Sequence, residues 1–170
     1  MDSAILFKEK QRFNQWWLWL IFIGINGLFI YGFYVQIIEH KIFGGKPMSN
    51  TGIIISTCVS LILTFLFYFI GLETVVKEDG IYVRFFPFQR KYKYFAWHQL
   101  SKTFIRSYMP LVEYGGWGLR FSLTGNGTAY NVSGKMGLQL EIESKGRILI
   151  GTQKPQELNK VLEQLGKIKI

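Results

Sequence analysis

The chain has 170 residues, of which 49% are hydrophobic, 17% aromatic and only 18% charged, and its formal net charge is +9. This length holds one or two small units, and so apolar a composition excludes disordered and fibrous proteins. The single cysteine, Cys58, excludes an internal disulfide and a cysteine metal cluster.

Two uncharged runs, residues 13–38 and 47–72, dominate the first half of the chain. A bilayer crossing needs about 20 apolar residues, and the cores at 16–35 and 53–72 reach that length. Buried helices of a soluble core are the alternative, but the rest of the chain is too short to wrap both. The first run is also too long for a secretory signal and lacks a small-residue cleavage site. We therefore predict two membrane-spanning helices joined by an external loop, 36–51.

The positions of Lys and Arg near the two predicted spans set their orientation. Three of these cations lie in residues 1–12, two in the loop 36–51 and five in residues 73–93. Because cytoplasmic segments carry an excess of Lys and Arg, we expect a multi-pass protein of the inner (plasma) membrane with both termini in the cytoplasm. The expected parts are a cytoplasmic tail, 1–12, the spans within 13–72, and a cytoplasmic domain, 73–170.

Small and polar residues recur inside the predicted spans. Asn26 lies near the middle of the first span, and a series with a period of four follows the second: Gly52, Ser56, Ser60 and Thr64. Small side chains let membrane helices approach closely, and an amide in hydrocarbon needs a partner. We predict that Asn26 forms a hydrogen bond across the hairpin and that this face packs the helices. A transport path is the disfavoured alternative, because the spans contain no Asp, Glu, His, Lys or Arg.

Residues 73–170 alternate β-branched or aromatic runs with glycine-containing turns. This pattern predicts three hairpins, formed by 74–77 with 81–86, 119–123 with 128–132, and 138–142 with 147–150. Two further runs, 92–97 and 103–108, bring the number of strands to about eight or fewer. After Pro155, apolar residues with helical spacing predict an amphipathic helix that ends at Gly166, with Thr152 as its N-cap. Such a meander with one terminal helix is typical of a barrel or bent sandwich.

Three glycine-marked stretches carry a family resemblance: Tyr114–Arg120, Gly134–Leu138 and Ile148–Pro155. Their order resembles the bacterial pleckstrin-homology-like (PH-like) domains of small two-span membrane proteins of unknown function, over about residues 72–166. The resemblance implies a bent antiparallel barrel of about seven strands, capped by a C-terminal α-helix. It also implies a binding or assembly module without catalytic residues, and the fold alone does not transfer a phosphoinositide ligand.

The segment 84–95 mixes cations with aromatic rings shortly after the second span. Its candidate lipid contacts are Arg90, Lys91 and Lys93, because each Lys or Arg near an anionic leaflet contributes about 1 kcal/mol. Phe86 or Phe88 would then enter the interface. The alternative is a solvated turn whose neighbouring aromatic side chains fill the domain core.

Gly115, Gly116 and Trp117 form a candidate ligand loop. The favoured alternative is structural, because glycine within a strand usually permits a bulge or a close backbone approach. His40 and His98 each lack a second metal ligand at usable spacing, so we expect neither a metal nor a cofactor.

These patterns together predict a non-enzymatic integral membrane protein that presents a binding or assembly domain at the cytoplasmic membrane face. Its expected partners are membrane lipids and either a second copy of the chain or another membrane protein. Nucleic acid is not expected, because the chain is tethered and lacks an RNA-binding signature. The alternative is a lipid-handling or small-ligand-handling protein, or an accessory subunit of a membrane enzyme or transport complex.

Overall fold

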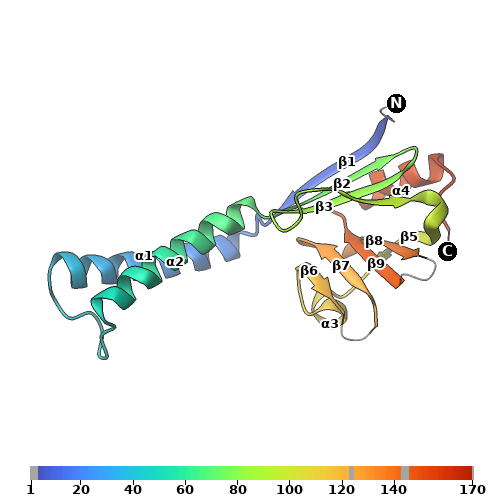
Figure 1. The fold of residues 1–170 in the computed structure, drawn as a ribbon. Helices are drawn as coiled ribbons and strands as arrows, with labels where there is room; N and C mark the ends of the chain where they lie inside the picture. Colours follow the sequence, from blue (N-terminus) through green and yellow to red (C-terminus); the bar gives the residue numbers. More distant parts are fainter. Residues whose placement is uncertain (1–3, 123–124, 143–145, 170) are drawn as a thin grey trace. The chain divides into compact units, whose positions relative to one another are not determined.

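The computed structural model describes residues 4–122, 125–142 and 146–169 (Figure 1). The chain divides into two compact units. Phe13–Phe69 form one unit, the helix pair, and Met1–Arg12 together with Ile70–Ile170 form the other, the β unit. The helix pair is therefore an insertion between two segments of a single folded unit.

The helix pair consists of α1 (Trp16–Phe33), continued by a π-helical turn (Tyr34–Ile38), and α2 (Asn50–Phe69). The two helical segments, Trp16–Ile38 and Asn50–Phe69, are long and apolar enough to cross a membrane. Only 11% of the residues in the first apolar window and 17% in the second are buried, unlike those of a core helix in a soluble protein. The second helix lies three residues earlier than predicted, because the chain is already extended at Gly71.

Sheet A has four strands in the order β1-β2-β3-β4. Their bounds are β1 (Ile5–Arg12), β2 (Gly71–Lys77), β3 (Gly80–Phe86) and β4 (Lys93–Ala96). All three neighbouring pairs are antiparallel. Residues 5–12, which the sequence analysis set apart as part of a tail, thus form the edge strand of this sheet.

Sheet B has five strands in the order β5-β8-β9-β7-β6. They are β5 (Leu100–Ser107), β6 (Gly118–Phe121), β7 (Thr128–Asn131), β8 (Met136–Ile142) and β9 (Gly146–Gly151). The β7–β9 pair is parallel, because β9 folds back between its hairpin partner β8 and the earlier strand β7. A short helix, α3 (Pro110–Tyr114), precedes β6, and Figure 1 shows it beside sheet B.

The predicted hairpins are present as β2–β3, β6–β7 and β8–β9. The bent antiparallel barrel of about seven strands is present only in part: the β unit is mostly β with a C-terminal helix, but the described residues form nine strands in two separate sheets and no closed barrel. Two features explain the difference. β1 contributes an additional strand, and the 3₁₀ turn Trp97–Gln99 carries the chain from β4 in one sheet to β5 in the other instead of pairing these strands.

The core of the β unit lies between the facing sides of the two sheets. Sheet A contributes alternate buried residues such as Phe7, Leu72 and Val83, and sheet B contributes Leu138 and Ile150. The terminal helix α4 (Pro155–Gln164) also faces this core, with two fully buried leucines, Leu158 and Leu162.

The ends of α4 were partly predicted. Gly166 adopts the left-handed conformation (φ +62°) directly after the C-cap residue Leu165, as expected of a helix stop. The N-cap is Lys154 instead of Thr152. The Thr152 hydroxyl accepts the Lys154 amide (3.0 Å) and donates to the buried Glu9 carboxylate (2.7 Å), which ties β1 to the end of sheet B.

Candidate functional site

The outward face of sheet A is basic. Along β1, Phe7, Glu9 and Gln11 are buried, whereas Lys8, Lys10 and Arg12 alternate with them and are exposed. Strands present alternate residues to opposite faces, so one face of β1 carries three cations in succession. Lys77 of β2 and Arg84 of β3 belong to the same outward face by register.

Glu73 is the carboxylate at the centre of this face and is only 8% exposed. It forms an ion pair with Lys10 of β1 (3.2 Å), accepts hydrogen bonds from Arg84 of β3, and accepts the Tyr92 hydroxyl (2.8 Å). Burial raises the pKa of Glu73, but the hydrogen bonds from Tyr92, Arg84 and Lys10 outweigh it and lower this pKa to about 2. One ionised side chain thus joins three strands and the loop after β3.

The β3–β4 loop, residues 87–92, leaves sheet A at the end that joins the helix pair. Arg12, the last residue of β1, pairs with Gly71, and Gly71 pairs with Phe86 at the end of β3. The loop therefore begins in the same row of the sheet at which the chain enters and leaves the helix pair.

The side chains of this loop and its flanks differ in accessibility. Phe88 is 69% exposed, and Arg90 and Lys91 are exposed without an ion pair in the described part of the chain. Lys93 is also exposed, but its ammonium group lies over the rings of Phe95 (5.4 Å) and Tyr130 (5.9 Å). Of the three predicted lipid contacts, Arg90 and Lys91 thus have no ion-pair partner among the described residues, whereas Lys93 lies over two aromatic rings.

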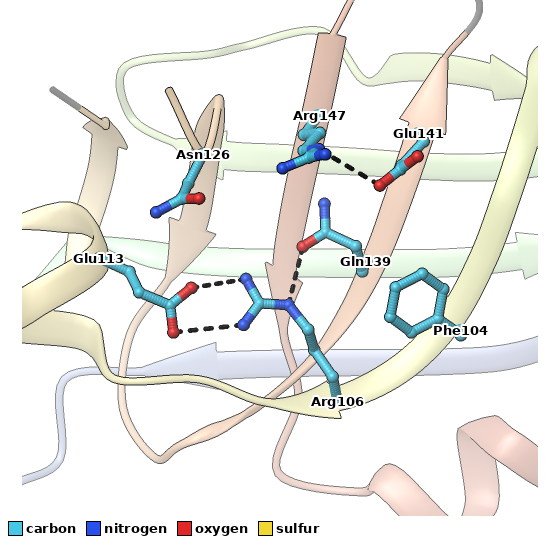
Figure 2. Close-up of a pocket in the computed structure, with 7 residues that line it drawn as sticks. All are labelled: Phe104, Arg106, Glu113, Asn126, Gln139, Glu141 and Arg147. Atoms are coloured by element: carbon cyan, nitrogen blue, oxygen red, sulfur yellow. Dashed lines mark hydrogen bonds and ion pairs between the residues drawn. The ribbon is translucent and has the colours of Figure 1, made fainter. Parts of the chain in front are cut away.

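A polar hollow of about 260 Å³ lies on sheet B (Figure 2). Arg106 of β5 donates two hydrogen bonds to the Glu113 carboxylate of α3 (2.7 and 3.2 Å) and a third to the Gln139 side-chain oxygen (3.0 Å). Across the hollow, Arg147 pairs with Glu141 (3.2 Å). Phe104 and Asn126 also line the hollow.

The two ion pairs balance the charge of this hollow. The hydrogen bonds from Arg106, the largest contribution, lower the pKa of the Glu113 carboxyl; burial raises this pKa, but the Arg106 bonds and the bond from the Met109 amide outweigh it. Because Arg106 contacts Glu113, Gln139 and the Ser107 carbonyl, its donors are committed within the fold. This arrangement holds α3 against sheet B and, among the lining residues that the structure describes, leaves little uncompensated charge for a ligand.

The predicted ligand loop follows α3. Gly115 is the C-cap of that helix in the left-handed conformation (φ +69°), which glycine adopts without strain. Trp117 is half-buried, and its indole donates a hydrogen bond to the Gly134 carbonyl (3.3 Å). The ligand-binding role of the loop formed by Gly115, Gly116 and Trp117 stays a prediction.

Within the helix pair, the hydrogen bond expected of Asn26 is present. Its amide donates to the Thr64 hydroxyl (2.7 Å), and its side-chain oxygen accepts from the Ser60 hydroxyl (3.0 Å). The contact line along α2 also includes the buried Ile53 and Thr57. Gly52 and Ser56 of the predicted series are half-buried beside that line.

Among residues 4–122, 125–142 and 146–169, no group of three or more His, Cys, Asp or Glu side chains could hold a metal ion. Comparisons with protein-family models, curated proteins and solved structures found no match to this chain.

The basic face of sheet A and its central carboxylate, Glu73, were not predicted from the sequence. A signal was present in β1, where Lys8, Lys10 and Arg12 recur at every second position. The buried partners in that alternation include the polar Glu9 and Gln11, so the strand lacked the usual apolar pattern. Glu73 was not recognised because its three partners come from β1, β3 and the β3–β4 loop.

Proposed function

We propose that this chain is a non-enzymatic membrane protein whose helix pair spans the cytoplasmic membrane. Its β unit, a PH-like binding or assembly module in this proposal, lies at the inner face and contacts anionic lipid head groups through the β3–β4 loop. The exposed apolar surface of both helices and the Lys and Arg bias toward residues 1–12 and 73–93 support the spanning arrangement.

The observation that carries the proposal is the position of the loop. Arg12, Gly71 and Phe86 share one row of sheet A, so the loop after Phe86 starts where both helices join the sheet. If the helices span a bilayer, this end of the sheet is tethered next to the bilayer surface. Phe88 is exposed there for insertion at the interface. Arg90 and Lys91, which form no ion pair with any residue the structure describes, are cations of the kind that anionic leaflets attract.

Aromatic residues at the ends of the helices support the same arrangement. Trp16 and Trp17 are exposed at the start of α1, and Tyr68 is exposed near the end of α2. Tyr31 and Tyr34 are exposed toward the other end of the first span. Trp and Tyr are enriched at the two interfaces of a membrane, so these positions fit helices that cross it completely.

The experiment is a depth measurement on the full chain in lipid nanodiscs. In a Cys58→Ser background, Phe88→Cys carries an environment-sensitive fluorophore, and lipids with a quencher in the acyl chain report contact. Glu78→Cys is the matched control. Glu78 follows Lys77, which lies six residues along β2 from Gly71, a distance of about 20 Å at roughly 3.3 Å per residue.

We expect quenching at position 88 that increases with the fraction of phosphatidylglycerol, and none at position 78. Arg90→Gln with Lys91→Gln should remove the dependence on phosphatidylglycerol. Equal quenching at the two positions, or quenching at 88 that ignores lipid charge, would contradict the proposed contact. Indifference of both positions to lipid would instead favour assembly with a protein partner.

A further inference from the structure

A second hollow, of about 370 Å³, lies on the outward face of sheet A. Its lining comes from β1, β2, β3 and the β3–β4 loop: Ile5, Lys8, Val75, Lys77, Tyr82 and Tyr92. Lys8, Val75 and Tyr82 are direct register partners in one row across three strands. Val75 is only 5% exposed although it belongs to the outward face, which makes it the apolar floor of the hollow.

The walls and the rim differ in chemistry. The hydroxyl of Tyr92 donates to Glu73 (2.8 Å) and that of Tyr82 donates to Asp79 (2.5 Å), so the two rings are held in place. Lys8 and Lys77 form no ion pair in the described part of the chain, and the Lys77 ammonium lies over the Tyr82 ring (5.4 Å).

The two hollows differ in the charge that is available to a ligand, and this difference favours the hollow on sheet A as a binding site. There, each lining arginine is already paired with a lining glutamate. Here, the described lining residues include two lysines and no carboxylate. Ligand pockets are usually of about 300–1,000 Å³, mostly apolar, with a few polar groups that fix orientation, and the hollow over Val75 matches that description.

We propose that this hollow binds an anionic amphiphile. A carboxylate or phosphate group lies between the ammonium groups of Lys8 and Lys77, and the apolar body covers Val75 and contacts the rings of Tyr82 and Tyr92. The inference goes beyond the loop contact proposed above. Val75 is four residues along β2 from Gly71, about 13 Å at 3.3 Å per residue, so this binding does not depend on the β3–β4 loop touching lipid.

The test is calorimetric titration of the full chain in phosphatidylcholine nanodiscs, with empty discs subtracted. The probes are octanoate and octanol, which share an apolar chain and differ in charge. Octanoate should bind at least tenfold more tightly than octanol, because only the anion forms ion pairs with the two ammonium groups, whose hydrogen bonds are stronger when donor and acceptor are both charged. Equal affinity for the two probes would overturn the proposal.

The variants separate this hollow from general surface charge. Lys8→Gln with Lys77→Gln should weaken octanoate binding at least tenfold, whereas Lys102→Gln with Lys160→Gln removes the same charge from β5 and α4 and should change it less than twofold. Val75→Phe fills the floor and should weaken both probes. Unchanged octanoate binding in the Lys8/Lys77 variant, or equal losses in both lysine pairs, would overturn the site.

Two further experiments identify the source of the anion and separate this proposal from the proposed lipid contact of the β3–β4 loop. Photo-crosslinking with diazirine-bearing phosphatidylglycerol in the disc labels residues 75–82 if a bilayer lipid supplies the amphiphile. Octanoate binding without such labelling identifies a soluble source. The Arg90/Lys91 variant should keep its octanoate affinity, and the Lys8/Lys77 variant should keep the quenching at position 88, so either proposal can fail alone.

Discussion

Arg12 and Gly71 are register partners across β1 and β2, so the helix pair is inserted between two adjacent antiparallel strands of one sheet. The segment before the first helix is therefore as much a part of the β unit as the segment after the second. Residues 5–12 are therefore an edge strand of the β unit and not a separate tail.

Phe7 provides the first test of that arrangement. Its side chain is 2% exposed within the core, and removal of a buried phenyl ring costs about 3–5 kcal/mol. Phe7→Ala should lower the unfolding free energy of the β unit by about that amount, measured by hydrogen exchange of β2 and β3 amides in the full chain in nanodiscs. Leu6→Ala, at the exposed neighbour, should change it by less than about 1 kcal/mol. Equal effects would contradict a structural role for β1.

The ionised Glu73 should make the unfolding free energy of the β unit depend on pH. Because its pKa is lowered from 4.5 to about 2 in the fold, the stabilisation is complete above pH 4.5 and is lost as the pH falls toward 2. A shift of this size corresponds to ~3 kcal/mol. Glu73→Gln should lower the unfolding free energy by about that amount at pH 6, and this difference should shrink below pH 4.5.

Hydrogen exchange of the β2 and β3 amides across this pH range measures the effect of Glu73. Glu78→Gln, in the exposed turn after β2, is the control and should follow the wild-type curve. A Glu73→Gln variant as stable as the wild type at pH 6 would show that the carboxylate does not hold the strands together.

The contacts of Arg106 should determine the stability of α3. Its two parallel hydrogen bonds to Glu113 (Figure 2) need the planar guanidinium group, which lysine cannot replace. Arg106→Lys should destabilise α3 by about 1–3 kcal/mol, measured as faster exchange of the Gly115 and Gly116 amides, which donate to α3 carbonyls.

The effect of Arg106 should depend on pH. Arg106 contributes most to the lowered pKa of Glu113, so the stabilisation is present above that carboxyl's ordinary pKa of 4.5 and is lost as the pH falls through its folded value. Arg120→Lys, on the neighbouring β6, should leave the Gly115 and Gly116 amides unchanged. If the Gly115 and Gly116 amides exchange as slowly in Arg106→Lys as in the wild type, other contacts hold α3 in place.

Asn26 tests the helix pair. Asn26→Leu removes the hydrogen bonds to Thr64 and Ser60, and such bonds contribute about 0.6 kcal/mol on average and up to roughly 1.7 kcal/mol in membrane proteins. Steric trapping of the full chain in bicelles should measure a loss in that range. Ile25→Leu, at an exposed neighbour on α1, should have no effect. An unchanged stability of Asn26→Leu would mean that the amide does not contribute to packing.

Local signals in the sequence predicted much of this structure. The two apolar runs, the three glycine-marked hairpins and the stop at Gly166 each depend on neighbours in the chain, and all are present. The parallel pairing of β7 with β9 and the separation of the sheets depend on contacts distant in sequence. β1 was missed because two of its three inward side chains are polar, and their partners, Thr152, Gln153 and Gly151, lie about 140 residues away.

The same distinction applies to the candidate sites. Arg90 and Lys91 were found because they are adjacent in sequence and follow the second span. The hollow over Val75 could not be found this way, since Lys8 and Lys77 are brought together only by the β1–β2 pairing across the inserted helices.

Cysteine accessibility in intact cells tests the central claim most directly. In a Cys58→Ser background, Lys46→Cys, Lys91→Cys and Lys160→Cys are each treated with a membrane-impermeant maleimide. Helices that span the membrane with the β unit inside predict labelling of position 46 from outside, and labelling of positions 91 and 160 only after permeabilisation. Labelling of positions 91 and 160 in intact cells, with position 46 protected, would contradict the orientation and the proposed contact with the inner leaflet.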